Sequence, residues 1–495
     1  MIKETLIAAA AAAMMAMPAV GAEQKEDGLR YDAEIGATFS TGDHAPFWMA
    51  NGQYGFSSLK RNNAWLRAGI FHDMDTTRRF TWGAGVDLGV ALNFERVFIP
   101  QQIYGEVKYR CLNAMLGQKE MRDDIIDSEL SSGGMTVSGN ARPIPQLRLG
   151  IFDYADVWGC KGWFAVKGYI GYGMFTDSKW IERYATPQMS YTTDVLYCTR
   201  AIYFKFGDRR QFPLVGEIGM RMDSQFGGTQ YSAENAEGLR RAYQNPTDFK
   251  AWIKGLIPLG GGSDTTPGEQ LNVQGNFLGN WTFALGWYDP SGWSVKAYYQ
   301  HFFEDHSMMT FDYAWKDGFW GVQGILPRNP FLTEAVVEFL YSKDQGGPVY
   351  FDHTPDLDIQ VSGRDWYYNN YIYTSWSNYG MGIGNPLIVS PLYNSPRDLY
   401  FQHTRVEAFN MGLRGNPSKR IDWTLRLSNI RSWGTYDTPT DKVRSDFSLL
   451  AKVNWHPERF KGWNASLSVG WDSGNLIGNN FGIGISISKT GFIKF

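Results

Sequence analysis

Residues 481–495 read FGIGISISKTGFIKF, and their side chains alternate between two kinds along the whole segment. One parity runs from Phe481 to Phe495 and contains four isoleucines with one lysine and one glycine, whereas the other consists mostly of glycine, serine and threonine. Because successive side chains of a strand point to opposite faces, this period of two predicts a strand with one apolar and one small polar face. The closing strand of a bacterial outer-membrane barrel has this pattern, since it faces lipid on one side and a wet lumen on the other. The alternative is an edge strand of a β-sandwich.

The same alternation recurs along the chain, and the apolar parity often begins or ends with an aromatic residue. It is found at residues 31–39, 80–94, 281–287, 293–299, 423–427, 447–455 and 463–471. A strand of about nine or ten residues flanked by aromatic side chains has the length and composition of a bilayer-crossing strand. Candidate strands number roughly 16 to 18, with residues 331–341 open to either strand or helix. Since single-chain bacterial barrels have an even number, we expect an all-β fold: a transmembrane antiparallel β-barrel of about 18 strands.

The first 22 residues have the features of a secretory signal peptide. A basic start at Lys3 is followed by an apolar run at 6–17 and by a small-residue cleavage site at 20–22. We therefore expect residues 1–22 to be cleaved on export and residues 23–495 to form a single barrel domain in the outer membrane. No later run approaches about 18 apolar residues, so no membrane-spanning helix is expected.

Composition restricts the function. Aromatic residues make up 16% of the chain and glycine occurs 55 times, as aromatic girdles and curved strands would require. The net charge of -3 argues against nucleic acid as a partner. The three cysteines, Cys111, Cys160 and Cys198, are too few for a disulfide framework or a metal set. One pair could be oxidised in an exported protein, and the sequence does not select which.

Three long stretches interrupt the strand pattern, at residues 117–145, 224–274 and 344–401. Long loops of outer-membrane barrels lie outside the cell. Residues 233–243 and 248–256 within the second stretch have helix-like patterns. We therefore expect long extracellular loops with short helical inserts that plug the outer mouth of the barrel.

Residues 366–379 read WYYNNYIYTSWSNY, in which seven of fourteen residues are Trp or Tyr. Flat aromatic rings stack on the apolar face of a sugar, and neighbouring amides and hydroxyls bind its polar edge. The alternative is an aromatic girdle with turn packing, and composition alone leaves both open. The carbohydrate-binding candidates, including two residues from the proline-rich turn that follows, are Trp366, Tyr367, Tyr368, Asn369, Asn370, Tyr371, Tyr373, Trp376, Tyr393 and Asn394.

Catalytic and metal motifs do not stand out. The Asp43–His44 pair would need a serine or a water across the barrel, and nothing marks one. No zinc-binding helix, phosphate loop, nucleophile elbow or EF-hand loop is present, so we expect no enzyme activity, no metal and no cofactor. Charged residues at or near lumen-facing positions are expected to form an internal ion-pair network: Arg67, Asp87, Glu106, Lys108, Arg110 and Arg426.

Several short motifs, in order along the chain, resemble the Wzi-type capsule-assembly outer-membrane proteins. These are HAPFWMAN at 44–51, SGNARPIP at 138–145, YNN at 368–370, IGNPL at 383–387 and PLYN at 391–394. The resemblance implies a barrel whose outer mouth is closed by loops and helices. It also implies a non-enzymatic, lectin-like protein that holds capsular or other surface polysaccharide on the outer membrane. Outer-membrane lipid is then a partner, and capsule export machinery a candidate partner.

Two alternatives of different class remain. A passive porin or solute transporter would have an open lumen with a charged constriction, and helical inserts argue against that. An outer-membrane protease or lipase would require a Ser/His or Asp/His constellation on facing strand ends.

Overall fold

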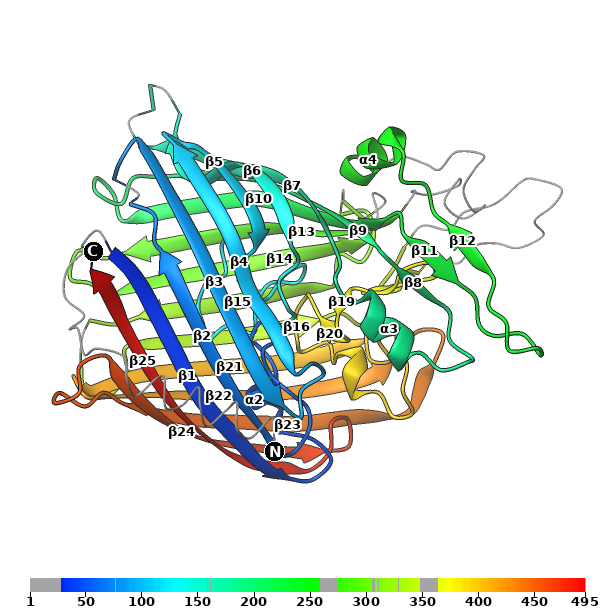
Figure 1. Ribbon diagram of the computed structural model, residues 1–495. Coiled ribbons are helices and arrows are strands. Elements are labelled where there is room, and N and C mark those ends of the chain that lie inside the picture. The colour runs from blue at the N-terminus through cyan, green and yellow to red at the C-terminus, as the bar shows by residue number, and fades with distance from the viewer. Residues whose placement is uncertain are drawn as a thin grey trace.

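The computed structural model describes residues 28–75, 77–157, 159–160, 162–258, 275–304, 308–309, 311–327, 329–347 and 364–494. The predicted signal peptide at 1–22 and the terminal Phe495 lie outside these residues. An antiparallel sheet of 18 strands closes into a barrel, as the alternation predicts (Figure 1). Its strands are β1 (Gly28–Thr41), β2 (Asn63–His72), β3 (Phe80–Leu92), β4 (Phe98–Tyr109), β5 (Leu112–Gln118), β6 (Gln146–Asp156), β7 (Phe164–Met174), β9 (Leu196–Phe206), β10 (Leu214–Phe226), β13 (Asn276–Tyr288), β14 (Ser294–Glu304), β15 (Gly318–Ile325), β16 (Glu334–Tyr341), β21 (Val406–Ser418), β22 (Ile421–Gly434), β23 (Pro439–Trp455), β24 (Trp463–Gly474) and β25 (Asn480–Lys494).

Each barrel strand pairs with the next barrel strand in the sequence, and β25 closes the ring by pairing with β1. In that register Ile35 lies opposite Ile487 and Ala37 opposite Ile485. Phe481 and the isoleucines of β25 are exposed on the outer face of the barrel. The intervening small residues face the lumen, so β25 is the closing strand that the alternation predicts.

The loops carry the remaining elements, which gather at one end of the barrel (Figure 1). Among the described residues, no helix is long and apolar enough to cross a membrane. The loop elements are α2 (Phe47–Ala50), α3 (Ser178–Tyr184), β8 (Tyr191–Thr193), β11 (Thr229–Tyr231), β12 (Ala242–Gln244), α4 (Phe249–Leu256), β17 (Asn369–Asn370), β18 (Thr374–Ser375), β19 (Ser377–Asn378), β20 (Met381–Gly382) and η1 (Pro391–Tyr393).

The structure confirms one of the two predicted helices and shows that residues 334–341 form a strand. The helix at 248–256 is confirmed as α4, where the Asp248 side chain accepts from the Ala251 amide at 2.9 Å. The helix predicted at 233–243 is wrong. There the Asn235 side chain accepts from the amides of Glu237 and Leu239, which closes a turn that leads into β12. Residues 334–341 of the ambiguous segment form strand β16.

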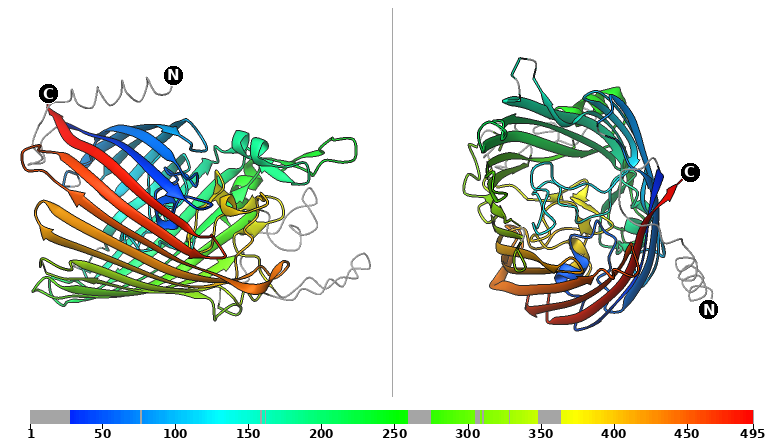
Figure 2. Two further views of the ribbon diagram at one scale, coloured as in Figure 1. Left: turned by 90° about the horizontal axis from the view of Figure 1, so that it is seen from below. Right: turned by 90° about the vertical axis from the view of Figure 1, so that its left-hand side faces the viewer.

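Three loop segments fold back into the lumen and together form what we call the plug: residues 42–62, 119–145 and 364–405. Figure 2 shows them crossing the interior of the barrel in the end-on view. Their apolar side chains share one buried cluster with residues of the barrel wall. Next to α2 the barrel wall has glycines at positions 470 and 482, which leave room for the plug. A Cβ at Gly470 or Gly482 would lie only 2.6 or 2.8 Å from the Pro46 ring.

Polar contacts fix the plug to the wall. The Phe47 amide donates to Asp472 at 2.9 Å and the Trp48 indole to Ser428 at 3.1 Å. The Ser132 amide donates to Glu338 on β16 at 2.8 Å. These side chains point inward from β16, β22 and β24, which lie within five consecutive strands of the sheet, so the contacts fix the plug to one sector of the wall.

The expected lumen ion pairs are confirmed for four of the six predicted residues. Arg67 donates to Asp87 at 2.9 Å and to Glu120 of the plug at 2.8 Å. Glu106 pairs with Lys119 at 2.7 Å, and Lys108 pairs with Asp153 at 3.1 Å.

The other two predicted lumen residues behave differently. Arg426 stacks over the Trp48 ring at 3.6 Å and donates to the Ser131 carbonyl, so it packs against the plug. Arg110 is exposed in the tight turn after β4, where its φ of 57° closes the hairpin, and the prediction that it belongs to the lumen network is wrong. Cys111 in the same turn, Cys160 and Cys198 are all free thiols, so the structure contains no pairing among them.

Candidate functional site

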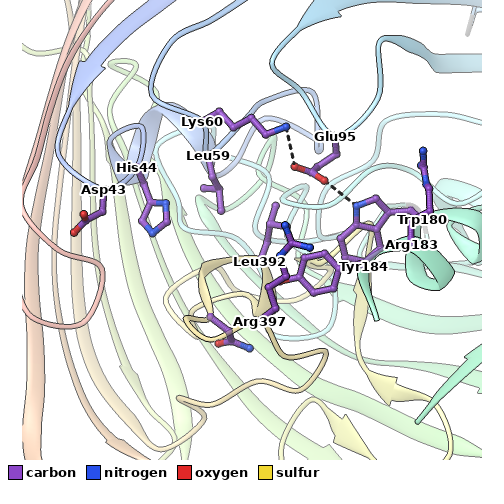
Figure 3. A pocket seen from close by; sticks show the side chains of 11 residues that line it. Asp43, His44, Leu59, Lys60, Glu95, Trp180, Arg183, Tyr184, Leu392 and Arg397 are labelled. Atoms are coloured by element: carbon purple, nitrogen blue, oxygen red, sulfur yellow. Dashed lines mark hydrogen bonds and ion pairs between the residues drawn. The ribbon is translucent and has the colours of Figure 1, made fainter. Parts of the chain in front are cut away.

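A cavity of about 440 Å³ opens at the loop end of the barrel, and we call it the mouth pocket (Figure 3). Two segments of the plug form one side of it, and α3 with the β3–β4 loop forms the other. Its lining residues are Asp43, His44, Leu59, Lys60, Glu95, Trp180, Arg183, Tyr184, Leu392, Asn394 and Arg397.

Two aromatic rings on α3 form a flat wall of this pocket. Trp180 and Tyr184 are four residues apart, so they lie on the same face of the helix. Their rings stack with centroids 4.6 Å apart and an angle of 22°. Trp180 is only 4% exposed, and its indole N–H donates to Glu95 at 2.9 Å. The stack is therefore held rigidly, with Tyr184 as its more accessible ring.

Charged side chains surround the aromatic wall. The Arg397 guanidinium lies 5.4 Å from the centroid of the Tyr184 ring. Lys60 lies 3.8 Å from the Glu95 carboxylate, and the Arg183 Nε donates to the Lys179 carbonyl. The pocket thus combines stacking surface, an amide at Asn394, and cationic and anionic groups that can bind hydroxyls or a carboxylate.

The Asp43–His44 pair also lines the pocket. None of the described residues that line it is a serine, threonine or cysteine. Burial lowers the pKa of His44, although Asp43 opposes this shift, and the imidazole packs edge-on against Tyr393 with ring centroids 5.4 Å apart. The His44 ring thus lines the pocket while it packs against the plug. Among the described residues, no group of three or more His, Cys, Asp or Glu side chains is placed to hold a metal ion.

Two of the predicted candidates lie at the mouth pocket. Asn394 lines it, and its Nδ2 also donates to the Asp398 and Tyr400 carbonyls. Tyr393 lies beneath it, largely buried, and accepts a hydrogen bond from the Asn51 Nδ2 at 2.8 Å. Tyr393 therefore supports the pocket from inside the plug.

Most of the aromatic segment 366–379 is core of the plug. Tyr367, Tyr368 and Trp376 have no exposed surface, and Asn369 and Tyr373 are also buried. Asn369, for example, exchanges hydrogen bonds with the backbone of Phe401 at 2.9 and 2.8 Å. Buried rings are not available to a ligand, so for these residues the structure favours the packing alternative.

Three predicted residues of that segment remain at its surface. Tyr371 is 76% exposed, while Trp366 and Asn370 are half-buried. Trp366 stacks on Tyr400 with centroids 5.1 Å apart and lies 5.4 Å from Tyr371. We call Trp366, Tyr371 and Tyr400 the aromatic patch. It is a second surface, beside the mouth pocket, with the aromatic composition that the sequence predicts for sugar stacking.

The sequence interpretation missed the aromatic wall and most of the charged lining of the mouth pocket. Trp180 and Tyr184 carry a weak signal, an aromatic pair spaced by four residues in a short helical piece. Lys60, Glu95 and Arg397 carry none, since single charges in loops are common and only folding brings these together.

Comparisons with known proteins agree with this architecture. No family model matches the chain, and no curated protein matches it. Among solved structures it is similar to Wzi of Escherichia coli, an outer-membrane protein involved in group 1 capsule assembly and described as a carbohydrate-binding β-barrel. That match has a TM-score of 0.55 and 12% identity, covering 94% of this chain and 85% of Wzi.

Two barrels of Pseudomonas aeruginosa are also similar. OpdQ matches with a TM-score of 0.46 and 9% identity, covering 95% of this chain and 100% of that one. OccK3 (OpdO) matches with a TM-score of 0.42 and 8% identity, covering 96% and 98%. At these identities the likeness to Wzi shows the fold, and this chain is a closed 18-stranded barrel of the kind found in outer-membrane proteins.

Proposed function

We propose that this chain is a non-enzymatic outer-membrane barrel that binds surface polysaccharide and supports capsule attachment at the cell surface. The observation that carries the proposal is the mouth pocket, where the Trp180–Tyr184 stack stands beside Arg397 and Asn394. Stacked rings with polar groups at their edge suit a sugar ring, which has an apolar face and a rim of hydroxyls.

The membrane location is supported by the outer surface of the barrel. Apolar side chains such as Phe80, Trp82, Ile485 and Ile487 are exposed on it. In water so large an exposed apolar surface would favour aggregation, whereas in a bilayer these side chains face lipid. Since long loops of such barrels lie outside the cell, the mouth pocket would face the exterior and the short turns the periplasm.

The plug favours this role over that of a passive porin. A diffusion channel needs a continuous polar lumen, but Trp48, Ile126, Trp376 and Leu387 are buried inside this one. A cavity of about 800 Å³ lies between the wall and the plug around Arg67, Asp87 and Glu120. Conductance decides whether ions pass beyond that cavity.

The test is binding of the purified, detergent-folded protein to the capsular polysaccharide of its own source, alongside conductance in a planar bilayer. Saturable binding without steady conductance is the expected result. Large steady conductance without binding would make the protein a porin and would overturn the proposal. Capsule export machinery as a partner stays a prediction, which co-purification from capsulated cells can address.

A further inference from the structure

A second, smaller cavity of about 20 Å³ lies directly against the mouth pocket. Leu59, Glu95 and Leu392 line both cavities, so these three side chains form the partition between them. The inner cavity also reaches Arg142, Asn378 and Tyr379 of the plug. Its volume suits one water or one small polar group of a larger ligand, but not a whole sugar ring.

Arg142 is an unusual residue for such a position. It is 6% exposed, yet its Nε and Nη1 have no hydrogen-bond partner among the described residues. Its guanidinium stacks over the Tyr379 ring at 4.2 Å. A buried cation with unused donors is costly, because it has given up water without gaining a full set of acceptors.

The Tyr379 hydroxyl and the Asp177 carboxylate interact with the Arg142 guanidinium, but its Nε and Nη1 donors remain unused by the described residues. The Glu95 carboxylate is engaged on the mouth-pocket side, where it accepts from the Trp180 indole at 2.9 Å and lies 3.8 Å from Lys60. A second cation, Arg96, donates to the Tyr379 hydroxyl at 2.8 Å, so two guanidinium groups contact Tyr379. The Asp177 carboxylate accepts a hydrogen bond from the Tyr379 backbone amide at 3.1 Å.

Asn378 supplies a complementary unpaired atom in the same cavity. It is fully buried, and its Nδ2 donates to the Arg142 carbonyl at 2.9 Å. Its Oδ1 has no donor among the described residues. The cavity therefore presents unused guanidinium donors and an unused amide acceptor, which match a carboxylate and a hydroxyl on neighbouring carbon atoms.

We propose that the inner cavity is an acid-recognition subsite, in which Arg142 binds the carboxylate of an acidic sugar residue whose ring lies in the mouth pocket. The inference rests on the proposed function and names its substrate class, an anionic polysaccharide bearing uronic acid or a similar carboxylate. The carboxylate would enter past Leu59 and Leu392, which line both cavities. Asn378 then accepts a hydrogen bond from the adjacent hydroxyl.

The probe that tests the subsite is D-glucuronate, titrated against the whole detergent-folded protein by saturation-transfer NMR, with D-glucose and acetate as comparisons. We expect the wild type to bind glucuronate at least about 10-fold more tightly than glucose, since a hydrogen bond to a charged group contributes that much or more. Acetate should bind more weakly than glucuronate, because it lacks the ring that fills the mouth pocket.

Two variants locate the effect at Arg142. Arg142→Gln should weaken glucuronate binding by about 10- to 100-fold and leave glucose unchanged. Arg142→Lys keeps the charge but lacks the planar fork, and it should fall between the two. Arg420→Gln, in a turn at the other end of the barrel, removes one positive charge as a matched control and should bind like the wild type. Heat-modifiable migration on gels establishes that each variant is folded.

The outcomes separate this inference from the proposed function. If the wild type shows no preference for glucuronate, or if folded Arg142→Gln binds it equally well, the cavity holds water only and the subsite is overturned. Where glucuronate does bind through Arg142, the natural polysaccharide is tested before and after reduction of its carboxyl groups. Loss of binding on reduction supports the subsite, whereas undiminished binding of the reduced polymer overturns it for the natural ligand. If glucuronate binds through Arg142 but no polysaccharide does, the subsite stands and the polysaccharide function fails.

Discussion

The Trp376 indole N–H donates a hydrogen bond of 2.9 Å to the Thr136 carbonyl oxygen, across a separation of 240 residues in the sequence. This contact joins two of the three plug segments inside the barrel. Further bonds run beside it, from the Ser138 amide to Ile383 at 3.0 Å and from the Asn385 Nδ2 to Gly133 at 2.6 Å. The two segments therefore behave as one packed unit.

Trp376→Ala should loosen the plug. The indole is fully buried, and its removal is expected to cost about 3–5 kcal/mol through lost burial, the cavity left behind and the lost hydrogen bond. Urea unfolding in detergent measures the stability, and planar-bilayer conductance should rise. Tyr371→Ala, from the exposed end of the same segment, is the control and should change stability by less than about 0.5 kcal/mol. Equal stabilities of the two variants would contradict this account of the plug.

Tyr184→Ala should weaken polysaccharide binding at the mouth pocket. Truncating an aromatic contact residue is expected to cost about 1 kcal/mol or more, which is at least about 5-fold in Kd. Tyr184→Phe keeps the ring stacked on Trp180 and should bind nearly as well as the wild type. Tyr371→Ala tests the aromatic patch separately, and we expect a smaller loss because that side chain is the more exposed. Unchanged binding by Tyr184→Ala would remove the aromatic wall from the site.

Arg67→Met should destabilise the barrel, because it leaves two buried carboxylates without their cationic partner. Asp87 is almost fully buried and Glu120 largely so, and Arg67 donates to both. Breaking a buried pair from one side costs about 3–5 kcal/mol. Adding Asp87→Asn and Glu120→Gln should recover part of that loss. The exposed pair Arg420–Glu458 is the matched control, and Arg420→Met should leave the midpoint of the same urea titration nearly unchanged.

Asp177 should make stability depend on pH. Burial raises the pKa of Asp177 to about 6, so between about pH 4 and pH 6 the folded chain binds more protons than the unfolded chain. This group therefore adds stability as the pH falls through that window, by up to about 3 kcal/mol.

Asp177→Asn should abolish that part of the profile. Burial lowers the pKa of His403 to about 4, which acts in the opposite direction, but His403 is common to both proteins and cancels in the difference. Parallel urea titrations at pH 7 and pH 5 measure the effect. A wild type that gains no more stability than Asp177→Asn on acidification would contradict it.

Cysteine labelling should reveal the orientation of the barrel. Cys111 is exposed in the β4–β5 turn, at the opposite end from the mouth pocket. If that end faces the periplasm, a membrane-impermeant maleimide will label Cys111 only after the outer membrane is permeabilised. Tyr371→Cys, at the loop end, should be labelled on intact cells. Labelling of Cys111 on intact cells would reverse the proposed orientation.

The sequence by itself determined the wall of this protein. In a barrel strand each residue faces either lipid or lumen, so the constraint repeats every two residues and can be read locally, as in residues 80–94 and 481–495. The helix α4 is equally local, since Asp248 caps it three residues away. The helix predicted at 233–243 is wrong because the Asn235 side chain binds the backbone and closes a turn, which the spacing of apolar residues does not indicate.

Only the tertiary structure decided the interior and the site. An aromatic run has the same composition whether its rings bind sugar or pack in a core, and Trp376 is buried because Thr136 and the wall surround it. The mouth pocket is assembled from four separate stretches of chain, near Lys60, Glu95, Tyr184 and Arg397. No local period links such residues, because their proximity follows from how the loops fold back into the barrel rather than from the alternation that builds its strands.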